Sequence, residues 1–296
     1  MQDTLILTDS NSGILQQEGR DQGIYVIPMP FTVNGEEYLE EISMSQEQFF
    51  DALQNDADVK TSQPSEFYLE DLWTTLLKDY KDIIYIPMSG GLSATCANAK
   101  TYAEKFDGRV HVVDNKRISI TQKLSVLEAN AMAKRGVPVR EILDYLDKTK
   151  SKASIYLTVS VLKYLKKGGR LSPAAAAIGD MLKIKPILYT RGDSFEKFAM
   201  TVSMGQARKK MLKQLRAELE GEFAEEYKQG KMAFSIAHTA IPDEAARTKA
   251  EIEREFPDMK VLFVDNLSLS VACHTGPGAL GIGLMYNGQD IKEAEY

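Results

Sequence analysis

The first half of the chain alternates short apolar runs with longer segments of helical periodicity. The apolar runs are rich in Ile, Val and Tyr and are bounded by turn residues, as β-strands are. Two helical segments, at 122–135 and 140–150, are separated by Gly136 and Pro138, a stop followed by a start. This order of strand, turn and helix predicts a parallel sheet with crossover helices. The predicted strands are 4–7, 25–31, 82–88 and 109–113.

Two local signals add detail to this half. Asn34 and Gly35 lie between strand-like runs within residues 31–39, and both turn positions tolerate a positive φ. We therefore predict a small antiparallel hairpin insertion there. Ser45, with Gln48 three residues later, forms a capping box and predicts the start of a helix.

The pattern changes beyond the second of these helices. A strand beginning near Ser154 is followed by a helix, a glycine turn at 168–169, a further helix and two strands around 191–193. One long amphipathic helix is predicted at 206–229. This mixture predicts an α+β domain after an α/β domain, with the boundary placed between 1–152 and 153–296.

Composition narrows the class of protein without naming a function. The 296 residues favour two domains, and 44% hydrophobic with 26% charged residues is typical of a globular protein. The net charge of −6, from 42 acidic and 36 basic residues, argues against a general nucleic-acid binder. Two cysteines suit a reducing compartment. The chain start reads as a strand rather than a signal peptide, and no apolar run reaches the roughly 20 residues that span a bilayer.

The first segment that suggests chemistry is the turn SGGLSAT at 89–95. It follows a predicted strand and opens a predicted helix, where backbone N–H groups without helical partners favour anions. Its spacing matches neither the dinucleotide fingerprint nor the P-loop. In the alternative interpretation, the glycines only tighten the turn and Ser93 only caps the helix.

A second hydroxyl-rich turn, TSQPS at 61–65, precedes the predicted helix that contains Trp73, and Pro64 suits its first turn. Alone, this turn is explained by capping. If both turns follow neighbouring parallel strands, they face the crevice where open α/β sheets bind ligands. Thr61 and Ser93 would then hold one carboxylate.

Two glycine turns in the second half carry a cation and an imidazole. In KKGGRLSP at 166–173, Arg170 offers a planar fork suited to carboxylate or phosphate, although a solvated loop is the alternative. In CHTGPGALG at 273–281, His274 is either a ligand or a structural residue. The two remaining histidines, His111 and His238, are expected at packing or surface positions.

Taken in order, these segments resemble a known family. TDS at 8–10, TSQPS, SGGLSAT, GGRLS and HTGPGALG follow one another along essentially the whole chain. Five motifs in register are far more specific than any one of them. The chain is therefore identified as a member of the DegV family.

The resemblance implies a two-domain fold with a parallel-sheet α/β/α domain, a second α+β domain and one long-chain fatty acid buried between them. Family members act as the fatty acid-binding subunit of a bacterial fatty acid kinase. On this basis the chain is a cytoplasmic, non-enzymatic carrier without a nucleotide site or cofactor of its own. A partner kinase phosphorylates the carried carboxylate, and an acyltransferase of phospholipid synthesis receives the acyl phosphate. Membrane association would be limited to transient contact.

The resemblance also assigns roles to individual residues. The carboxylate-binding set and the set for phosphate contact or kinase docking are both drawn from the turns described above. Family members often carry an extra arginine where Gln206 stands, which puts phosphate contact or docking at this position in doubt. Apart from the resemblance, the apolar segments 178–188 and 267–284 are candidates for lining the tail, with a plain core role as the alternative. The carboxylate-binding set is Thr61, Ser62, Ser93, Ala94, His274 and Thr275, and the phosphate or docking set is Arg170, Gly169 and Gln206.

Two other classes of function remain open. A self-contained phosphotransfer enzyme would use His274 as the nucleophile and would consume ATP or a phosphodonor alone. A lipid-sensing regulator would bind fatty acid without forming acyl phosphate. Chain length, unsaturation preference, the partner kinase and the oligomeric state are not indicated by the sequence.

Overall fold

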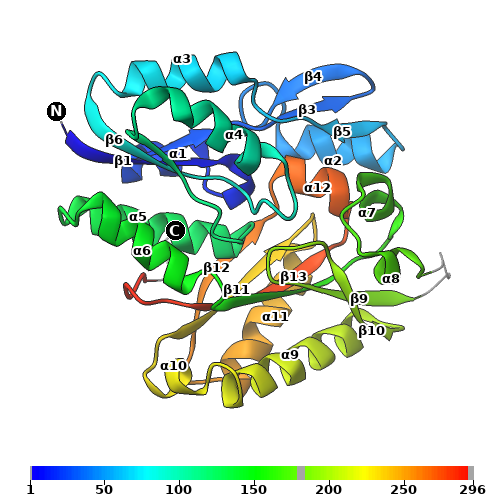
Figure 1. The fold of residues 1–296 in the computed structure, drawn as a ribbon. Coiled ribbons are helices and arrows are strands. Elements are labelled where there is room, and N and C mark those ends of the chain that lie inside the picture. Colours follow the sequence, from blue (N-terminus) through cyan, green and yellow to red (C-terminus); the bar gives the residue numbers. More distant parts are fainter. Residues whose placement is uncertain (1, 179–183, 293–296) are drawn as a thin grey trace. The chain divides into compact units, whose positions relative to one another are not determined.

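The computed structural model describes residues 2–178 and 184–292, which fall into two compact units (Figure 1). The first unit is Met1–Ser151 together with Ser268–Ser270, and the second is Lys152–Leu267 with Val271–Tyr296. The division after Ser151 lies beside the boundary predicted from the sequence. The sequence, however, placed all of 153–296 in the second domain, whereas Ser268–Ser270 groups with the first unit.

The first unit is built on a parallel sheet of four strands in the order β2-β1-β6-β7. β1 pairs in parallel with both β2 and β6, and β6 pairs in parallel with β7. This confirms the predicted parallel sheet. The strands are β1 (Gln2–Asp9), β2 (Ile24–Ile27), β6 (Tyr80–Ile86) and β7 (Val110–Val112).

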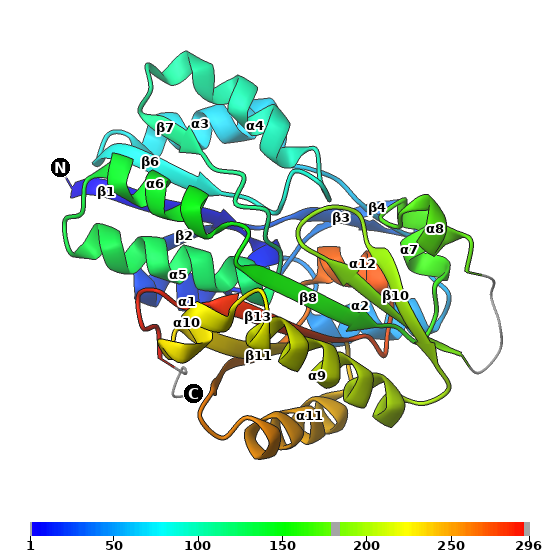
Figure 2. The ribbon, with the colours of Figure 1, turned by 60° about the horizontal axis from the view of Figure 1, so that its bottom comes forward.

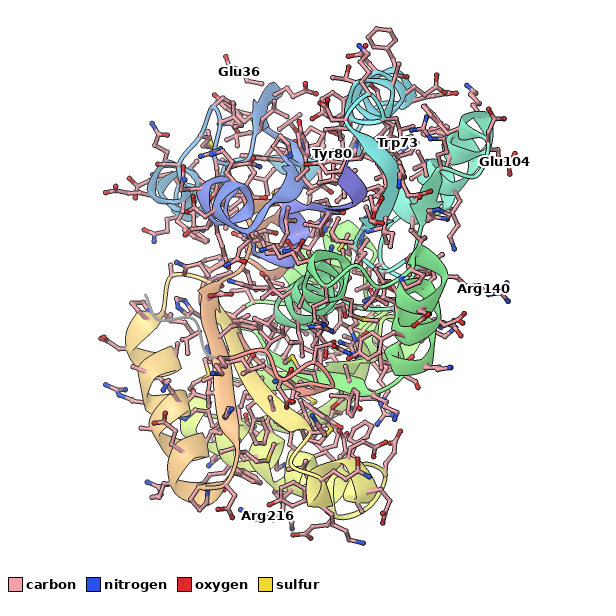
Figure 3. The ribbon with its side chains drawn as sticks, turned by 90° about the vertical axis from the view of Figure 1, so that its left-hand side faces the viewer. Glu36, Trp73, Tyr80, Glu104, Arg140 and Arg216 are labelled. Atoms are coloured by element: carbon pink, nitrogen blue, oxygen red, sulfur yellow. The ribbon has the colours of Figure 1, made fainter. Side chains whose placement is uncertain are left out.

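Alternation along the strands gives this sheet two cores. Leu5 and Leu7 of β1 pack with Trp73 on one face, while Ile6 packs with Val126 on the other, because successive side chains of a strand point to opposite faces. Helices α3 and α4 cover the first face and α5 and α6 the second (Figure 1), which makes three layers. Figure 3 shows Trp73 among the side chains of this unit and the exposed Arg140 pointing away from the ribbon.

A small antiparallel sheet, β4-β3-β5, belongs to the same unit. The predicted hairpin is confirmed: β3 (Pro30–Val33) pairs with β4 (Glu36–Leu39), and Asn34 and Gly35 both have positive φ. The single strand predicted at 25–31 is wrong. It is two strands in two sheets, because Pro28 has no N–H to continue the β2 ladder. β5 is Val59–Thr61.

The helices of the first unit follow their local signals closely. Ser45 and Gln48 form the predicted capping box. Pro64, expected in the first turn of the next helix, instead precedes its N-cap, Ser65. Gly136, with φ of 73°, follows the end of the first of the two helices predicted at 122–135 and 140–150. The helices are α1 (Gln16–Gln22), α2 (Gln46–Gln54), α3 (Glu66–Leu76), α4 (Thr95–Ala103), α5 (Ile120–Lys134) and α6 (Val139–Thr149), with 3-10 turns η1 (Ser10–Ser12) and η2 (Glu104–Phe106).

The second unit contains a mixed six-stranded sheet in the order β10-β9-β8-β13-β11-β12. Among the strands that the structure describes in this sheet, only β11 and β12 pair in parallel. The β9–β10 hairpin forms at the turn predicted around 191–193. This confirms the α+β character. The strands are β8 (Ala153–Thr158), β9 (Lys185–Thr190), β10 (Glu196–Thr201), β11 (Met232–His238), β12 (Lys260–Asn266) and β13 (Leu280–Tyr286).

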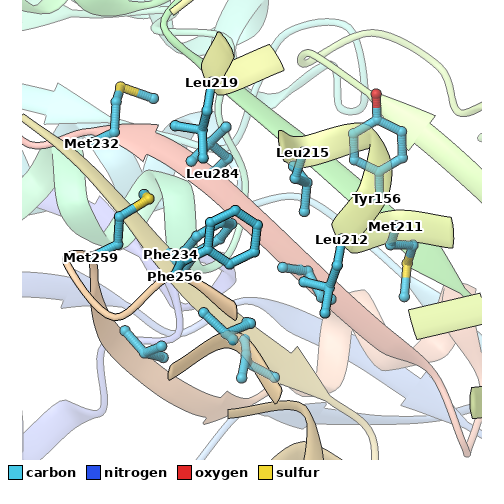
Figure 4. Packing of buried hydrophobic residues seen from close by; sticks show 14 of the residues in the cluster. Tyr156, Met211, Leu212, Leu215, Leu219, Met232, Phe234, Phe256, Met259 and Leu284 are labelled. Atoms are coloured by element: carbon cyan, nitrogen blue, oxygen red, sulfur yellow. The ribbon is translucent and has the colours of Figure 1, made fainter. Parts of the chain in front are cut away.

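Helices α9 (Met204–Glu220) and α11 (Pro242–Glu255) cover one face of this sheet (Figure 2). Leu212, Leu215 and Leu219 of α9 pack against sheet residues such as Phe234 (Figure 4). The single helix predicted at 206–229 is wrong, since Gly221 takes a non-helical conformation, with φ −111° and ψ −95°. The remaining helices are α7 (Lys163–Gly168), α8 (Pro173–Ala176), α10 (Ala224–Lys228) and α12 (Leu269–Thr275).

Within the described residues, none of the helices has the length and apolar character needed to cross a bilayer. The two cysteines, Cys96 and Cys273, are buried thiols. No group of three or more potential His, Cys, Asp or Glu metal ligands occurs in the part of the chain that the structure describes.

Candidate functional site

The turn SGGLSAT joins β6 to α4 at the carboxyl edge of the parallel sheet. Ser93 is partly buried, and its Oγ accepts a hydrogen bond from the Thr95 N–H at 3.2 Å and lies 2.9 Å from the Thr95 hydroxyl. Ala94, fully helical in φ and ψ, is the exposed N-cap of α4. Ser93 thus stabilises the start of α4 from the position before its N-cap, and the residue remains partly exposed.

The expectation of backbone N–H groups without partners in this turn is wrong for most of its length. The Gly90 N–H donates to the Asp114 carboxylate at 3.2 Å, and the Gly91 N–H donates to the Ser89 hydroxyl at 3.2 Å. The Leu92 and Ser93 N–H groups both donate to the Ser89 carbonyl. An anion at this turn would therefore rely on side-chain hydroxyls more than on a row of open amides.

The carboxylate site considered from the sequence required the turn TSQPS to follow a strand of the parallel sheet. In the structure it does not. β5 pairs antiparallel with β3 in the small sheet, and the Ser62 N–H donates to the Pro30 carbonyl at 3.1 Å. A side-chain hydrogen bond of 2.9 Å from Asn98 Nδ2 of α4 to Gln63 Oε1 nevertheless ties this turn to the helix that follows Ser93. The structure therefore links the two hydroxyl turns, although the route differs from the one expected.

Asp9, in the TDS segment at the end of β1, is a fully buried carboxyl that the sequence analysis gave no role. Its oxygens accept hydrogen bonds from the Met88 N–H at 3.0 Å and from Gln122 Nε2 at 3.1 Å, besides one from the Asn11 N–H. Burial raises the pKa of Asp9, and these donors oppose the rise. Asp9 thereby ties the end of β1 to Met88, the residue directly before the turn SGGLSAT.

In the second unit, Arg170 and His274 are electrostatic neighbours. Desolvation by burial, and then the charge of Arg170, lower the pKa of His274 to about 4. Gly168 packs against the imidazole so closely that a methyl group there would overlap the ring. Arg170 donates to the Gly168 carbonyl, and burial lowers its pKa. His274 is therefore neutral at pH 7 and faces a half-buried cation.

The turn after His274 is equally tight. Thr275 is 2% exposed, and among the described residues its hydroxyl has no hydrogen-bond partner. Gly276 has φ of 69°, and a Cβ atom there would overlap the ring of Tyr164 in α7. A buried hydroxyl without a partner is rare in folded proteins and is normally satisfied by water or ligand.

The other predicted positions have more ordinary surroundings. Gly169 ends α7 in the left-handed conformation and is exposed. Gln206 is exposed in the first turn of α9, where its N–H donates to the Ser203 hydroxyl. His111 lies 3.3 Å from Asp82, and His238 is buried at the end of β11. Residues 179–183 of the tail-lining segment 178–188 lie outside the described residues.

Each unit thus presents its own set of polar groups: hydroxyls at linked turns in the first, and a cation, a neutral imidazole and a buried hydroxyl in the second. These are suited to binding an anionic head group, and no nucleotide fingerprint accompanies them. A family model described as "Uncharacterised protein, DegV family" matches residues 3–287. The chain belongs to the DegV family. This confirms the family named from the motifs. The mixed α/β architecture, with a parallel-strand sheet in one unit and a six-stranded sheet in the other, confirms the expected DegV fold.

Among DegV relatives, a DegV domain-containing protein of Staphylococcus aureus is 30% identical over 283 residues, covering 94% of this chain and 97% of that one. One of Clostridium perfringens is 31% identical over 289 residues, covering 95% and 97%. A solved DegV family structure from Thermus thermophilus, whose description reports fatty acid binding, has 26% identity and a TM-score of 0.86, covering 96% of this chain and 99% of that one. DegV of Bacillus subtilis, described as a fatty acid binding protein, has 26% identity and a TM-score of 0.84, covering 97% and 100%.

Proposed function

We propose that this DegV protein is a fatty acid carrier that presents the carboxylate of one bound fatty acid to a partner kinase. The observation that carries the proposal is the fold's similarity, over 96% of the chain, to the Thermus thermophilus protein described as fatty acid-binding. Two other solved structures of similar fold are described with stearic acid and with vaccenic acid.

The energetics of a long-chain ligand fit a carrier. Burying an alkyl tail contributes roughly 0.8 kcal/mol per CH₂, or on the order of 10 kcal/mol for a long chain before association costs. A hydroxyl hydrogen bond contributes only about 1 kcal/mol net. The tail supplies affinity and the hydroxyls supply orientation.

In the first unit, we assign the carboxylate contacts to Thr61 and Ser93, assisted by Ser62 and by the backbone at Ala94. The support for this assignment is local. Thr61 ends β5 one residue before Ser62, Ser93 precedes α4, and the Gln63–Asn98 hydrogen bond links the two turns. Hydroxyl donors at fixed positions orient a carboxylate without a full positive charge beside it, which leaves its oxygen nucleophilic.

In the second unit, we assign His274, Thr275 and Arg170 to the head group and to the phosphoryl step. Arg170 carries the charge that a transferring phosphoryl group requires, since cations stabilise its developing negative charge. His274 is neutral at pH 7 and so is able to accept or donate a single hydrogen bond. Gly169, which lets the chain turn directly before Arg170, and the exposed Gln206 are assigned to phosphate contact or kinase docking.

On this proposal the nucleotide is bound by the partner kinase, the product is an acyl phosphate, and an acyltransferase of phospholipid synthesis consumes it in the cytoplasm. The carrier itself performs no turnover. The fatty acid is its ligand rather than a cofactor.

The first test is mass spectrometry of lipid extracted from the purified, denatured protein, followed by an ATP-consumption assay of the same sample with and without a fatty acid kinase. One stoichiometric fatty acid, with ATP consumed only in the presence of the kinase, is the expected result. ATP consumption by the protein alone would instead indicate a phosphotransfer enzyme based on His274. Bound lipid without acyl phosphate after addition of kinase and ATP would indicate a regulator.

A further inference from the structure

A buried carboxyl that no motif identified lies directly after β4. Glu40 is 3% exposed, and its two oxygens contact different parts of the chain. Oε2 forms a 2.6 Å hydrogen bond with the hydroxyl of Ser10, and Oε1 accepts one from the Leu269 N–H. The Ser10 hydroxyl also accepts a hydrogen bond from the Met29 N–H at 3.1 Å. Glu40 therefore joins η1, the β3–β4 hairpin and the segment Ser268–Ser270.

A second hydrogen bond holds the same segment independently. The Ser270 hydroxyl donates to Asn11 Oδ1, and Ser268 Oγ lies 3.3 Å from Ser270 Oγ. These residues are all buried, with exposures of 5% or less. The contacts explain why three residues whose chain neighbours belong to the second unit are grouped with the first. We call Ser10, Asn11, Glu40, Leu269 and Ser270 the Glu40 latch.

Burying a carboxylate in such a contact is energetically unfavourable, because the charged form loses its hydration. Desolvation raises the pKa of Glu40 to about 8, opposed by hydrogen bonds from Ser10, Leu269 and Ser270, while the charge of Glu41 adds to the rise. Of the elements around it, η1 brings the buried Asp9 next to Ser10, and Ser268–Ser270 brings no charged side chain. If the latch opened, Glu40 would be hydrated and would titrate near its ordinary value of 4.5.

The latch holds the first turn of a helix that matters for the proposed function. α12 begins at Leu269 and ends at Thr275, and Ser270 and His274 are four residues apart, one turn along the same helix face. The position of the helix start fixes where the last turn of so short a helix places its side chains.

We propose that Glu40 is a positioning residue that holds α12 by its first turn and so retains the bound ligand, whose release follows opening of the latch. This inference rests on the proposed carrier function. Opening exposes the Glu40 carboxyl, so it is coupled to loss of a proton. The open fraction therefore rises by up to about tenfold per pH unit between roughly pH 5 and 8, and then levels off.

Three variants of the full chain separate this role from simple folding. Glu40→Gln keeps the shape of the side chain, one acceptor for the Leu269 N–H and a donor toward Ser10. Its amide does not ionise between pH 5 and 8. Glu40→Ala removes both contacts. Ser270→Ala removes the bond to Asn11 and the contact with Ser268 Oγ, and leaves the side chain of Glu40 in place. Glu37→Gln, three residues earlier on β4 and exposed, is the matched control.

Two readouts are measured from pH 5 to 8: amide hydrogen-exchange protection factors of Leu269 and Ser270 in the ligand-free protein, and the rate of stearate transfer from the protein to phosphatidylcholine vesicles. Glu40→Ala and Ser270→Ala should lower protection and speed transfer by about tenfold or more. In Glu40→Gln the pH dependence of both readouts should flatten, with protection at pH 7 at least that of the unaltered protein. Glu37→Gln should keep the pH dependence.

Unchanged protection and transfer in Ser270→Ala and Glu40→Gln across this pH range would overturn the proposal, even if Glu40→Ala failed to fold. If the unaltered protein bound no stearate or other fatty acid, the carrier function would fail instead, and the protection factors alone would decide whether the latch exists.

Discussion

His274 shows how burial sets the chemistry of a single side chain. Its pKa is lowered to about 4, first by desolvation and then by Arg170. A histidine with a lowered folded-state pKa stabilises the fold fully above its unfolded pKa of about 6.5, and this contribution is lost as pH falls from 6.5 toward 4. We expect His274→Asn to flatten the pH dependence of unfolding free energy in that window, by at most about 3 kcal/mol. Urea unfolding at pH 4.5 to 7 measures this, and an equal slope in both proteins would contradict it.

Replacing Ser93 should affect the orientation of the bound carboxylate more than the affinity for the fatty acid. Ser93→Ala removes one hydroxyl, so stearate affinity should fall by no more than about tenfold. The kinase-coupled rate of acyl phosphate formation should fall further, by about tenfold or more, because the carboxylate is no longer held toward the kinase. Ser65→Ala, which removes the N-cap of α3 in the same unit, is the control and should cost about 1 kcal/mol of stability without changing that rate. An unchanged coupled rate in Ser93→Ala would remove Ser93 from the proposed site.

The sequence identified residues with a local signal and overlooked those without one. Ser93 and His274 stand beside glycine turns, which mark unusual backbone geometry in any sequence. Glu40 sits in an acidic, polar stretch and looks like a surface residue, because its burial depends on Leu269, 229 positions away. Long-range contacts of this kind leave no trace in local patterns.

At the level of elements, the end of α7 offers a matched pair of glycines. Gly168→Ala adds a methyl group against the His274 ring, whereas Gly169→Ala adds one in open space at a φ of 68°. Gly169→Ala should cost about 1 kcal/mol of stability, the ordinary price of a left-handed residue, and leave His274 unchanged. Gly168→Ala should cost more and shift the ring resonances of His274 in an NMR spectrum. Identical His274 resonances in both variants would contradict the packing described here.

Element prediction succeeded where caps and turns decide the structure and failed where one residue interrupts a periodic run. The hairpin at Asn34 and the capping box at Ser45 require only neighbouring residues, and both formed. Pro28 split a run that reads as one strand, because the lost N–H outweighs β-propensity. Gly221 ended a helix whose amphipathic pattern continues beyond it.

For the whole molecule, the two units have separate cores. Leu215 lies in the core of the second unit and Trp73, the only tryptophan, in a core of the first. Leu215→Ala should lower stability by about 2–5 kcal/mol and shift the circular dichroism transition more than the tryptophan fluorescence transition. Lys213→Ala, exposed on the same helix, should shift neither. Equal shifts of both signals in Leu215→Ala would show that the units unfold together.

The order of strands and helices predicted the architectures of both units. The structure divides after Ser151, and the sequence placed its boundary after residue 152. It did not predict that Ser268–Ser270 returns to the first unit. Three residues are too few to form a periodic pattern, and their assignment rests on hydrogen bonds rather than on hydrophobic spacing.

That return also constrains how genes of this family can recombine. A crossover near residue 151 would combine one parent's Glu40 with the other parent's residues 268–270, although the two are joined by hydrogen bonds in the folded chain. Chimeras that exchange 268–270 together with the N-terminal half should be recovered as folded protein more often than those cut once at the apparent domain boundary. The gene segment that encodes the first unit is therefore interrupted, because residues 268–270 are encoded far downstream of residue 151.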